Sequence, residues 1–397
     1  MDLYNNYPAN TYGNPTYTTS YLGTGAALSL NRSSSQYAAF TSPQLRFNSS
    51  SFTIEVWIYP ISLSTSDYGI FGQCQAGTTN LCMFFLVRNL ALHCGSWNYD
   101  LHGSTTLTMN TWYHAACVYN LATQTRQVWL NGVLDASRSS TPYVGVSGDT
   151  TIGVGYLTPP GANFFNGYFD QMQFTLRAKN STEILNDATL VVYYPFDNAF
   201  LYDYGPNGIN ATASGTPTTI FGRINQAVQF SSGAYITQSY PGFYMLGVSG
   251  KPFTLSIWVQ PIGTLAQSSI IFAHGSTGWC VSLITTQSNG QVLLNAWAGY
   301  DVIVGGPILS LNTWTHIGYT YSVSNGIRLY INGTQYGTSG GFNITAAGIP
   351  VYVTVGSNYG SNICVPGYGG SFNGAVDEFY VFCRELSASE ISALANP

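Results

Sequence analysis

Charged residues are scarce in this sequence, and their scarcity limits what the protein can bind. Only 7% of the 397 residues are charged and the net charge is -5, whereas an average soluble domain is roughly 25% charged. Nucleic acids and anionic membranes are bound by clusters of Lys and Arg, so we expect neither as a partner. A polar, nearly uncharged surface tends to associate. We therefore expect attached glycans, or burial in an assembly, to cover part of it.

Long apolar runs and targeting signals are also lacking. No run of about 18 apolar residues occurs, so we expect no membrane insertion. The opening M-D-L-Y-N-N-Y has no basic and apolar signal regions, which argues against secretion if Met1 is the native start. Six N-x-[ST] sequons favour the opposite interpretation, an extracellular, secreted glycoprotein, and we adopt it. The alternative is chance, because the chain is rich in Asn, Ser and Thr. The candidate glycosylation sites are Asn31, Asn48, Asn180, Asn210, Asn332 and Asn343.

The seven cysteines include no C-x-x-C pair, which disfavours zinc and thioredoxin-like sites and favours disulfides. Cys74 and Cys82 flank a turn of Gly, Thr and Asn and are our candidate for a disulfide that closes a hairpin. The odd count leaves at least one cysteine unpaired or linked to another chain. Cys117 lies in an alternating strand where the second half of the chain has Tyr319, so a buried thiol is an alternative there.

The chain is an internal duplication. The nonamer F-T-I-E-V-W-I-Y-P at 52–60 returns as F-T-L-S-I-W-V-Q-P at 253–261, an offset of 201 residues. A W-x-H motif, an alternating run and an Asn-Gly turn occur at 112–132 and again at 314–333, which predicts two long antiparallel strands in each half. F-N-G-x-x-D recurs at offset 207, and each half ends on an Arg followed by Glu-Ile.

Many short alternating strands with almost no helix predict an all-β protein of antiparallel sandwich or jelly-roll type. Taken in order, the motifs resemble the laminin-G-like (LamG) branch of the concanavalin A-like lectin and glucanase superfamily, over residues 22–187 and 189–397. The resemblance implies two tandem jelly-roll domains, at 22–187 and 188–397, each with a convex and a concave sheet. It also implies a family of mostly non-catalytic recognition or adhesion modules.

The two halves differ most at their start. The second half opens with L-V-V-Y-Y-P-F at 190–196, well before Ala227, whereas only 26 residues precede the matching Ala27. Either the extended arm at residues 1–21 supplies an abbreviated first strand, or the first sandwich lacks one. A missing strand would leave a sheet edge open to the arm of an identical neighbour. The arm residues assigned to this self-assembly are Leu3, Tyr4, Tyr7, Pro8, Tyr12, Pro15 and Tyr17.

Catalytic and metal sites find little support. No closely spaced carboxylate cluster of the glucanase type, nucleophile elbow or phosphate loop is present, so we expect no enzyme and no catalytic residue. The resemblance makes Ca²⁺ a possible cofactor, with oxygen ligands from Asp197, Asp203 and Asn207, or from Asp149 or Asp301. No contiguous calcium loop occurs, and Asx turns are the simpler explanation, so our expectation is no metal and no cofactor.

Sugar recognition requires aromatic faces beside polar groups. Corresponding segments of the two halves supply the candidates; core or interface packing is the alternative. The candidate residues are Trp97, Tyr99, Asp100, Trp297, Tyr300 and Asp301.

Three functions follow from these observations. The first, which we favour, is a non-catalytic extracellular structural glycoprotein that self-associates. Its arm adds to a neighbouring subunit, and the assembly can be a fibril, because open head-to-tail contacts of this kind generate filaments. The alternative is a soluble carbohydrate-binding or adhesion module, lectin-like in its partners. The third, a glycoside hydrolase, lacks a carboxylate that could be named.

Overall fold

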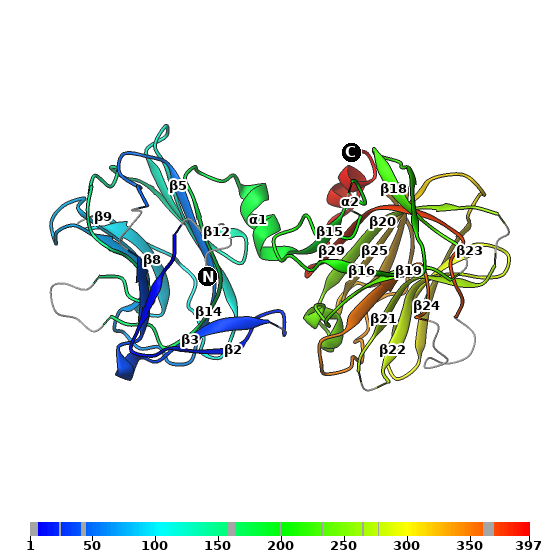
Figure 1. Ribbon diagram of the computed structural model, residues 1–397, viewed down its shortest axis with the longest axis horizontal. Helices are drawn as coiled ribbons and strands as arrows, with labels where there is room; N and C mark the ends of the chain where they lie inside the picture. Colours follow the sequence, from blue (N-terminus) through cyan, green and yellow to red (C-terminus); the bar gives the residue numbers. More distant parts are fainter. Residues whose placement is uncertain are drawn as a thin grey trace. The chain divides into compact units, whose positions relative to one another are not determined.

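The computed structural model describes residues 7–23, 25–40, 45–97, 99–156, 163–198, 200–231, 233–263, 266–276, 278–359 and 369–397. It divides into two compact units, unit 1, made mainly of Gly25–Ala188, and unit 2, made mainly of Thr189–Pro397. Regular structure in the described residues is almost entirely antiparallel β-strand, and each unit consists of two sheets (Figure 1). The predicted all-β fold with two tandem sandwiches is confirmed.

Unit 1 contains two sheets, and the chain crosses between them several times. The first sheet, in spatial order among the described residues, is β1 (Asn10–Tyr12), β4 (Tyr37–Phe40), β13 (Thr150–Ile152), β6 (Tyr68–Cys74), β7 (Cys82–Arg88), β8 (Ala91–Ser96) and β9 (Tyr99–His102). The second is β12 (Val133–Ser139), β11 (Thr125–Leu130), β10 (Tyr113–Asn120), β5 (Phe52–Pro60), β14 (Gly167–Thr175), β3 (Ala26–Leu30) and β2 (Thr16–Thr19). Helix α1 (Ser181–Thr189) follows β14.

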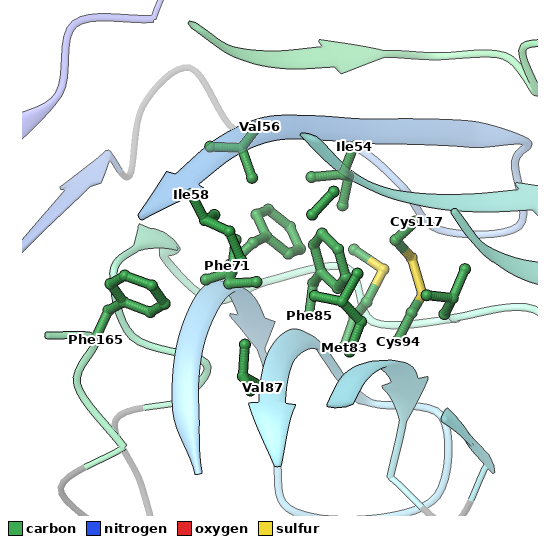
Figure 2. Close-up of a cluster of buried hydrophobic side chains, with 14 of the residues drawn as sticks. Ile54, Val56, Ile58, Phe71, Met83, Phe85, Val87, Cys94, Cys117 and Phe165 are labelled. Carbon is green, nitrogen blue, oxygen red and sulfur yellow. A yellow bond between two sulfur atoms is a disulfide. The ribbon is translucent and has the colours of Figure 1, made fainter. Parts of the chain in front are cut away.

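The core of unit 1 lies between its two sheets because each strand places alternate side chains on the inner face. From β5 these are Phe52, Ile54, Val56 and Ile58, all fully buried as the alternation predicts. Figure 2 shows them meeting side chains of the facing strands β6 to β8 and of Phe165. The disulfide between Cys94 on β8 and Cys117 on β10 crosses this core.

Unit 2 repeats the arrangement. Its first sheet, again in spatial order for the described residues, is β17 (Thr218–Phe221), β18 (Gln226–Phe230), β29 (Gly374–Phe382), β20 (Phe253–Pro261), β25 (Thr315–Ser322), β26 (Gly326–Ile331) and β27 (Thr334–Thr338), and β15 (Leu190–Tyr194) also pairs with β29. Its second is β16 (Ala211–Ser214), β19 (Tyr235–Gln238), β28 (Tyr352–Val355), β21 (Ser268–His274), β22 (Cys280–Thr286), β23 (Gln291–Trp297) and β24 (Asp301–Ile308). Helix α2 (Ala388–Leu394) follows β29 and begins with the capping box of Ser387 and Glu390.

The N-terminal arm pairs with its own sandwich. Strand β1 is antiparallel to β4, with the Tyr12 ring stacked 4.5 Å from that of Tyr37, and β2 is antiparallel to β3. The arm therefore supplies two strands to unit 1 within the same chain, at the places that β16 and β17 take in unit 2. Tyr7 packs against the core and its ring lies 5.7 Å from that of Phe40. Leu3 and Tyr4, which we assigned to self-assembly, lie outside the described residues.

The last long strand of unit 2, β29, pairs with a strand that has no described counterpart in unit 1. Strand β15 pairs with the second half of β29, from Phe379 to Phe382. The equivalent second half of β14 pairs with β5 on one side, and no described strand pairs with it on the other. This difference follows from the shorter opening segment that the sequence showed for the first half.

The cysteines are largely disulfide-bonded. Cys74 and Cys82, the pair expected to close a hairpin, are joined across β6 and β7. Cys117, for which a buried thiol was the alternative, is joined to Cys94, and Cys280 is disulfide-bonded as well. Burial raises the pKa of the Cys383 thiol to about 11.

Candidate functional site

A polar and aromatic cluster covers the outer face of strands β7 to β9 in unit 1. Met83, Phe85 and Cys94 point into the core, so the alternating residues of these strands point away from it. They include Arg88 on β7 and His93 on β8. We define the outer-face cluster by its members: Asp67, Arg88, His93, Trp97, Asp100 and Tyr156.

Arg88 joins the two carboxylates of this cluster. Its Nε lies 2.6 Å from Oδ1 of Asp67, and its Nη1 lies 2.8 Å from Oδ2 of Asp100. His93 Nδ1 is 3.0 Å from the same Asp100 oxygen, and the Tyr156 hydroxyl donates to Asp67 Oδ2 at 3.0 Å. The side chains of Arg88, Asp67 and Asp100 keep 19 to 30% of their surface exposed. The network is therefore fixed in position but still reached by solvent.

The electrostatics hold the network in its charged form. Burial alone would raise the pKa of Asp67, but the hydrogen bond and charge of Arg88 outweigh it, and the pKa lies below its usual value. The hydrogen bond to Asp67 likewise raises the pKa of Arg88. Asp100 keeps one acceptor unused, because its Oδ1 is buried and accepts no hydrogen bond from any described group.

Aromatic rings border the cluster on one side. Trp97 lies edge-on to Tyr156, with ring centroids 6.1 Å apart, and both rings are half-buried. Gly95 on β8 pairs with Asp100 on β9. A Cβ at Gly95 would lie 3.1 Å from Asp100 Oδ1. The glycine therefore gives the carboxylate its space beside the rings.

The sequence candidates in unit 1 are separated by the strand alternation. Trp97 and Asp100 lie on the outer face, as members of the cluster. Tyr99 pairs with Ser96, one position out of phase, so its side chain belongs to the other face. The structure thus brings two of the three candidates together and adds four residues that the sequence did not single out.

The candidates in unit 2 occupy different strand positions. Asp301 begins β24 and pairs with Trp297, and Tyr300, 61% exposed, lies in the turn between them. In unit 1 the turn precedes Tyr99, and Asp100 pairs with Gly95. The two Tyr-Asp pairs match in sequence spacing but not in register. The strands β22 to β24 carry a single charged residue, Asp301, so no counterpart of the outer-face cluster forms on them.

The repeated Trp and His residues form scaffold in both units. His114 and His316 are buried beside Trp57 and Trp258, with ring centroids 5.4 Å apart in each pair. Burial lowers the pKa of His114 to about 3 and that of His316 to about 4. The Asn of each Asn-Gly turn, Asn131 or Asn332, accepts a hydrogen bond from the backbone N–H of the corresponding histidine at 2.9 Å.

The aspartate of F-N-G-x-x-D also has the same structural role twice. Asp170 accepts from the backbone N–H groups of Tyr21 and Gln171, and Asp377 accepts from those of Ile224 and Glu378. In each half the aspartate therefore links the segment before the nonamer to the last long strand of the unit.

The carboxylates considered for calcium serve separate turns. Asp203 accepts from the backbone N–H groups of Tyr193, Gly205 and Ile209, while Asp197 accepts from Gln226 and Asn225. Asn207 donates to the carbonyls of Leu190 and Val191. Within the described residues no group of three or more His, Cys, Asp or Glu side chains is placed to hold a metal ion.

The glycosylation candidates lie mostly on the surface. Asn48 is half-buried, and the other five are exposed: Asn31, Asn180, Asn210, Asn332 and Asn343. Among the described residues no helix is long and apolar enough to cross a membrane.

The residues that sequence analysis missed come from segments outside the repeated motifs. Asp67 and Tyr156 lie in loops outside the strands and are 89 residues apart in the sequence. The one available signal was charge scarcity, because Arg88 belongs to a set of only 11 Lys and Arg residues in the chain. A charged residue inside a strand of so uncharged a protein already indicates a special position.

Comparison with known proteins identifies the fold family. The Laminin_G_3 model, described as concanavalin A-like lectin/glucanases superfamily, matches residues 32–185 and 228–392, more than half of the chain. No curated protein sequence matches.

Several solved structures are similar to part of this chain. Domain 4 of AbnA, an extracellular arabinanase of Geobacillus stearothermophilus solved with arabinotriose, is 20% identical with a TM-score of 0.38, over 52% of this chain and 98% of that one. The binding domain of Paraclostridial Mosquitocidal Protein 1 is 17% identical with a TM-score of 0.42, over 53% and 52%. A botulinum neurotoxin type C structure, whose description concerns two ganglioside molecules, is 18% identical with a TM-score of 0.39, over 53% and 51%. This chain thus spans about half the length of the two toxin chains. The likenesses concern the fold alone.

Proposed function

This chain belongs to the concanavalin A-like lectin/glucanases superfamily, and we propose that it acts as a non-catalytic binding module whose unit 1 recognises a saccharide at the outer-face cluster. The observation that carries the proposal is the network of Asp67, Arg88 and Asp100, whose side chains stay 19 to 30% exposed and which Tyr156 joins to the ring of Trp97. A sugar ring presents hydroxyl donors at its rim and an apolar face, so it fits a site of this composition.

The network around Asp100 supports binding by its rigidity. Arg88 and His93 both contact Asp100 Oδ2, and 30% of the Asp100 side chain stays exposed, so a ligand hydroxyl can approach the carboxylate from solvent. The Tyr156 hydroxyl and Asp67 fix the other end of the network. A site whose groups are already held in place loses little conformational freedom when a ligand binds. Trp97 and Tyr156 then provide the apolar contact.

Binding to a glycan array, followed by titration calorimetry with the best ligand, tests this function. Asp100→Asn keeps the shape of the side chain and replaces its charge, and we expect it to weaken binding at least about tenfold, or about 1.4 kcal/mol. Trp97→Ala should weaken it similarly. The matched control is Asp301→Asn, in the corresponding sequence position of unit 2, which should bind like the wild type. Equal effects of the two Asn variants, or no glycan binding at all, would refute the proposal.

The setting we propose is extracellular. The disulfides Cys74–Cys82 and Cys94–Cys117 support it, since such bonds persist in oxidising compartments. The five exposed sequons support it as well. Mass spectrometry of the native protein tests this point: glycan on at least one sequon is expected, and six unmodified asparagines would contradict it.

A second candidate is the self-associating structural glycoprotein that the sequence favoured. The second half of β14 supports this candidate, because no strand pairs with one of its sides in the described part of unit 1. A free strand side of this kind can accept a strand from a neighbouring subunit. Because β1 and β2 pair with their own sandwich, the arm would have to exchange between subunits. Deletion of residues 1–18 tests the exchange: a truncated protein that still assembles like the full chain does not use its arm.

A further inference from the structure

Strand β24 in unit 2 is an unusually exposed sheet edge. It has eight residues and pairs with β23, and no described strand lies on its other side. Of the strands that end the sheets, this is the longest in the described part of the chain. An edge strand presents a row of backbone donors and acceptors that another strand can use.

The side chains of β24 favour pairing rather than prevent it. Its sequence, D-V-I-V-G-G-P-I, contains one charged residue, Asp301, and four β-branched ones. Ile303 and Ile308 are 41% and 59% exposed. Natural edge strands are usually protected by charged side chains, proline or short length. In β24 such protection is confined to its two ends, with Asp301 at the start and Pro307 near the end.

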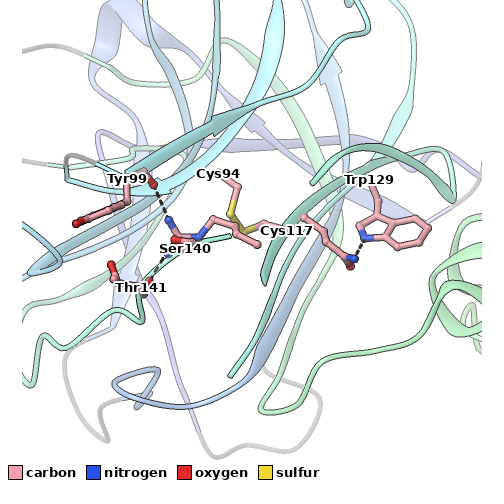
Figure 3. The surroundings of a disulfide bond; sticks show 8 residues. Cys94, Tyr99, Cys117, Trp129, Ser140 and Thr141 are labelled. Carbon is pink, nitrogen blue, oxygen red and sulfur yellow. Dashed lines mark hydrogen bonds between the residues drawn. A yellow bond between two sulfur atoms is a disulfide. The ribbon is translucent and has the colours of Figure 1, made fainter. Parts of the chain in front are cut away.

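The equivalent edge of unit 1 is closed. Strand β9 has only four residues, and arginine side chains bond two successive carbonyls, one of which faces the free edge. Arg126 Nη1 donates to the Tyr99 carbonyl and Arg138 Nη1 to the Asp100 carbonyl, both at 2.6 Å. Figure 3 shows the hydrogen bond at the Tyr99 carbonyl as a dashed line. The position of Arg126 is occupied by Ile327 in unit 2, since each pairs with the equivalent tyrosine of the preceding strand. The same fold thus has a blocked edge in one copy and an open edge in the other.

We propose that β24 pairs antiparallel with β24 of a second copy of this chain. Pro307 has no N–H and limits the pairing to Asp301 and the five residues after it. Centred on Ile303, the pairing places Asp301 opposite Gly305, so the two carboxylates do not face each other. The same surface then meets itself across a two-fold axis, as a closed dimer requires. The low charge of β24 also favours a second copy as its partner, because a strand with one charged residue then pairs with a strand that is equally poor in charge. The dimer depends neither on the arm nor on the outer-face cluster.

Sedimentation analysis of the full chain over a range of concentrations tests the dimer, with hydrogen exchange to locate it. We expect a monomer–dimer equilibrium and slower exchange of β24 amides as the concentration rises. Ile303→Lys places two ammonium groups close together across the axis and should raise the dissociation constant at least about tenfold. The matched control is Phe221→Lys, on the edge strand β17 of the other sheet of unit 2, where the side chain is 93% exposed. It should dimerise like the wild type.

Four results would overturn the proposal. They are a wild type that stays monomeric at every concentration, a dimer whose β24 amides exchange at the monomer rate, unchanged dimerisation of Ile303→Lys, and equal weakening by Phe221→Lys. The thermal unfolding of both variants should match that of the wild type, because both side chains are exposed. If Ile303→Lys unfolds early, Ile303→Glu replaces it, because two carboxylates facing each other across the axis also repel.

Discussion

Protonation of two buried histidines is expected to govern how this protein responds to acid. His114 is 3% exposed and His316 is fully buried. Burial lowers the pKa of His114 to about 3, with a smaller contribution from the charge of Lys179, and burial lowers that of His316 to about 4. In the unfolded chain both pKa values return to about 6.5. Each histidine thus binds a proton far more readily after unfolding.

The sign of the effect follows from this difference. Above pH 6.5 the two histidines are neutral in both the folded and the unfolded protein, so their burial does not lower the stability. As the pH falls below 6.5, the histidines bind protons in the unfolded protein but not in the folded one, and the free energy of unfolding decreases. At pH 5 the unfolded pKa lies 1.5 units above the pH, and each unit is worth about 1.4 kcal/mol. Each histidine should therefore cost its unit about 2 kcal/mol at pH 5 relative to pH 7.

Replacement of one histidine isolates its contribution. When the pH falls from 7 to 5, the free energy of unfolding of unit 1 should decrease by about 2 kcal/mol less in His114→Gln than in the wild type. The decrease in unit 2 should be the same in both proteins. Denaturant titration followed by hydrogen exchange of the β10 and β25 amides measures both units in one sample. His102→Gln, which removes an exposed histidine of the same unit, is the control and should keep the wild-type response.

The comparison remains valid although another group titrates nearby. Burial raises the pKa of Glu55, whose carboxylate lies 3.9 Å from His114 and shares Lys179 with Asp187. A raised acid pKa works in the opposite sense, since stability is then lost as the pH rises. Glu55 is present in both the wild type and the variant, so the difference between them reports on His114. An identical loss in both would show that His114 is not kept neutral by burial.

Three further predictions concern stability. Deletion of residues 7–19 removes β1, β2 and the core contact of Tyr7, so hydrogen exchange should accelerate in unit 1 and stay unchanged in unit 2; equal effects on both units would contradict this. Changing Cys94 and Cys117 to Ala opens a loop of 23 residues and should lower the free energy of unfolding of unit 1 by about 3 kcal/mol in denaturant titration; no loss would argue against the bond. Gly132→Ala, at φ +80° with its Cβ 2.7 Å from a Leu185 side-chain atom, should cost more than about 1 kcal/mol in thermal unfolding; a neutral result would show that the turn relaxes.

The fold was predictable because the sequence states it twice. Two matching nonamers, two Asn-Gly turns and two F-N-G-x-x-D motifs fix the same strands in each half, and Asp170 and Asp377 make the same backbone contacts. The offset of 201 residues also misled in one place. It matches Tyr99–Asp100 with Tyr300–Asp301, although the turns before β9 and β24 differ by one residue and place these pairs in different registers.

The candidate site was only half predictable for a physical reason. Trp97 and Asp100 stand three residues apart and could be chosen by composition, whereas Asp67 and Tyr156 reach them only through the pairing of distant strands. The same applies to the edges. Whether Arg126 and Arg138 cap β9 depends on where two neighbouring strands of the other sheet place their side chains, and no local pattern in the sequence records that.

The two copies diverge where each would meet a partner. Unit 1 carries the outer-face cluster and a blocked edge, whereas the equivalent strands β22 to β24 of unit 2 carry no counterpart of that cluster and no described strand covers their edge. Under the two proposals a dimer formed through β24 would present two saccharide sites. Two linked sites bind a surface that displays many copies of the sugar far more tightly than one site does, without any new contact. Ile303→Lys should therefore weaken adhesion to a glycan-coated surface but leave the affinity for the free sugar in calorimetry unchanged. Asp100→Asn should weaken both. A variant at β24 that weakened free-sugar binding as much as surface binding would show that the edge acts on the site itself, not through dimerisation.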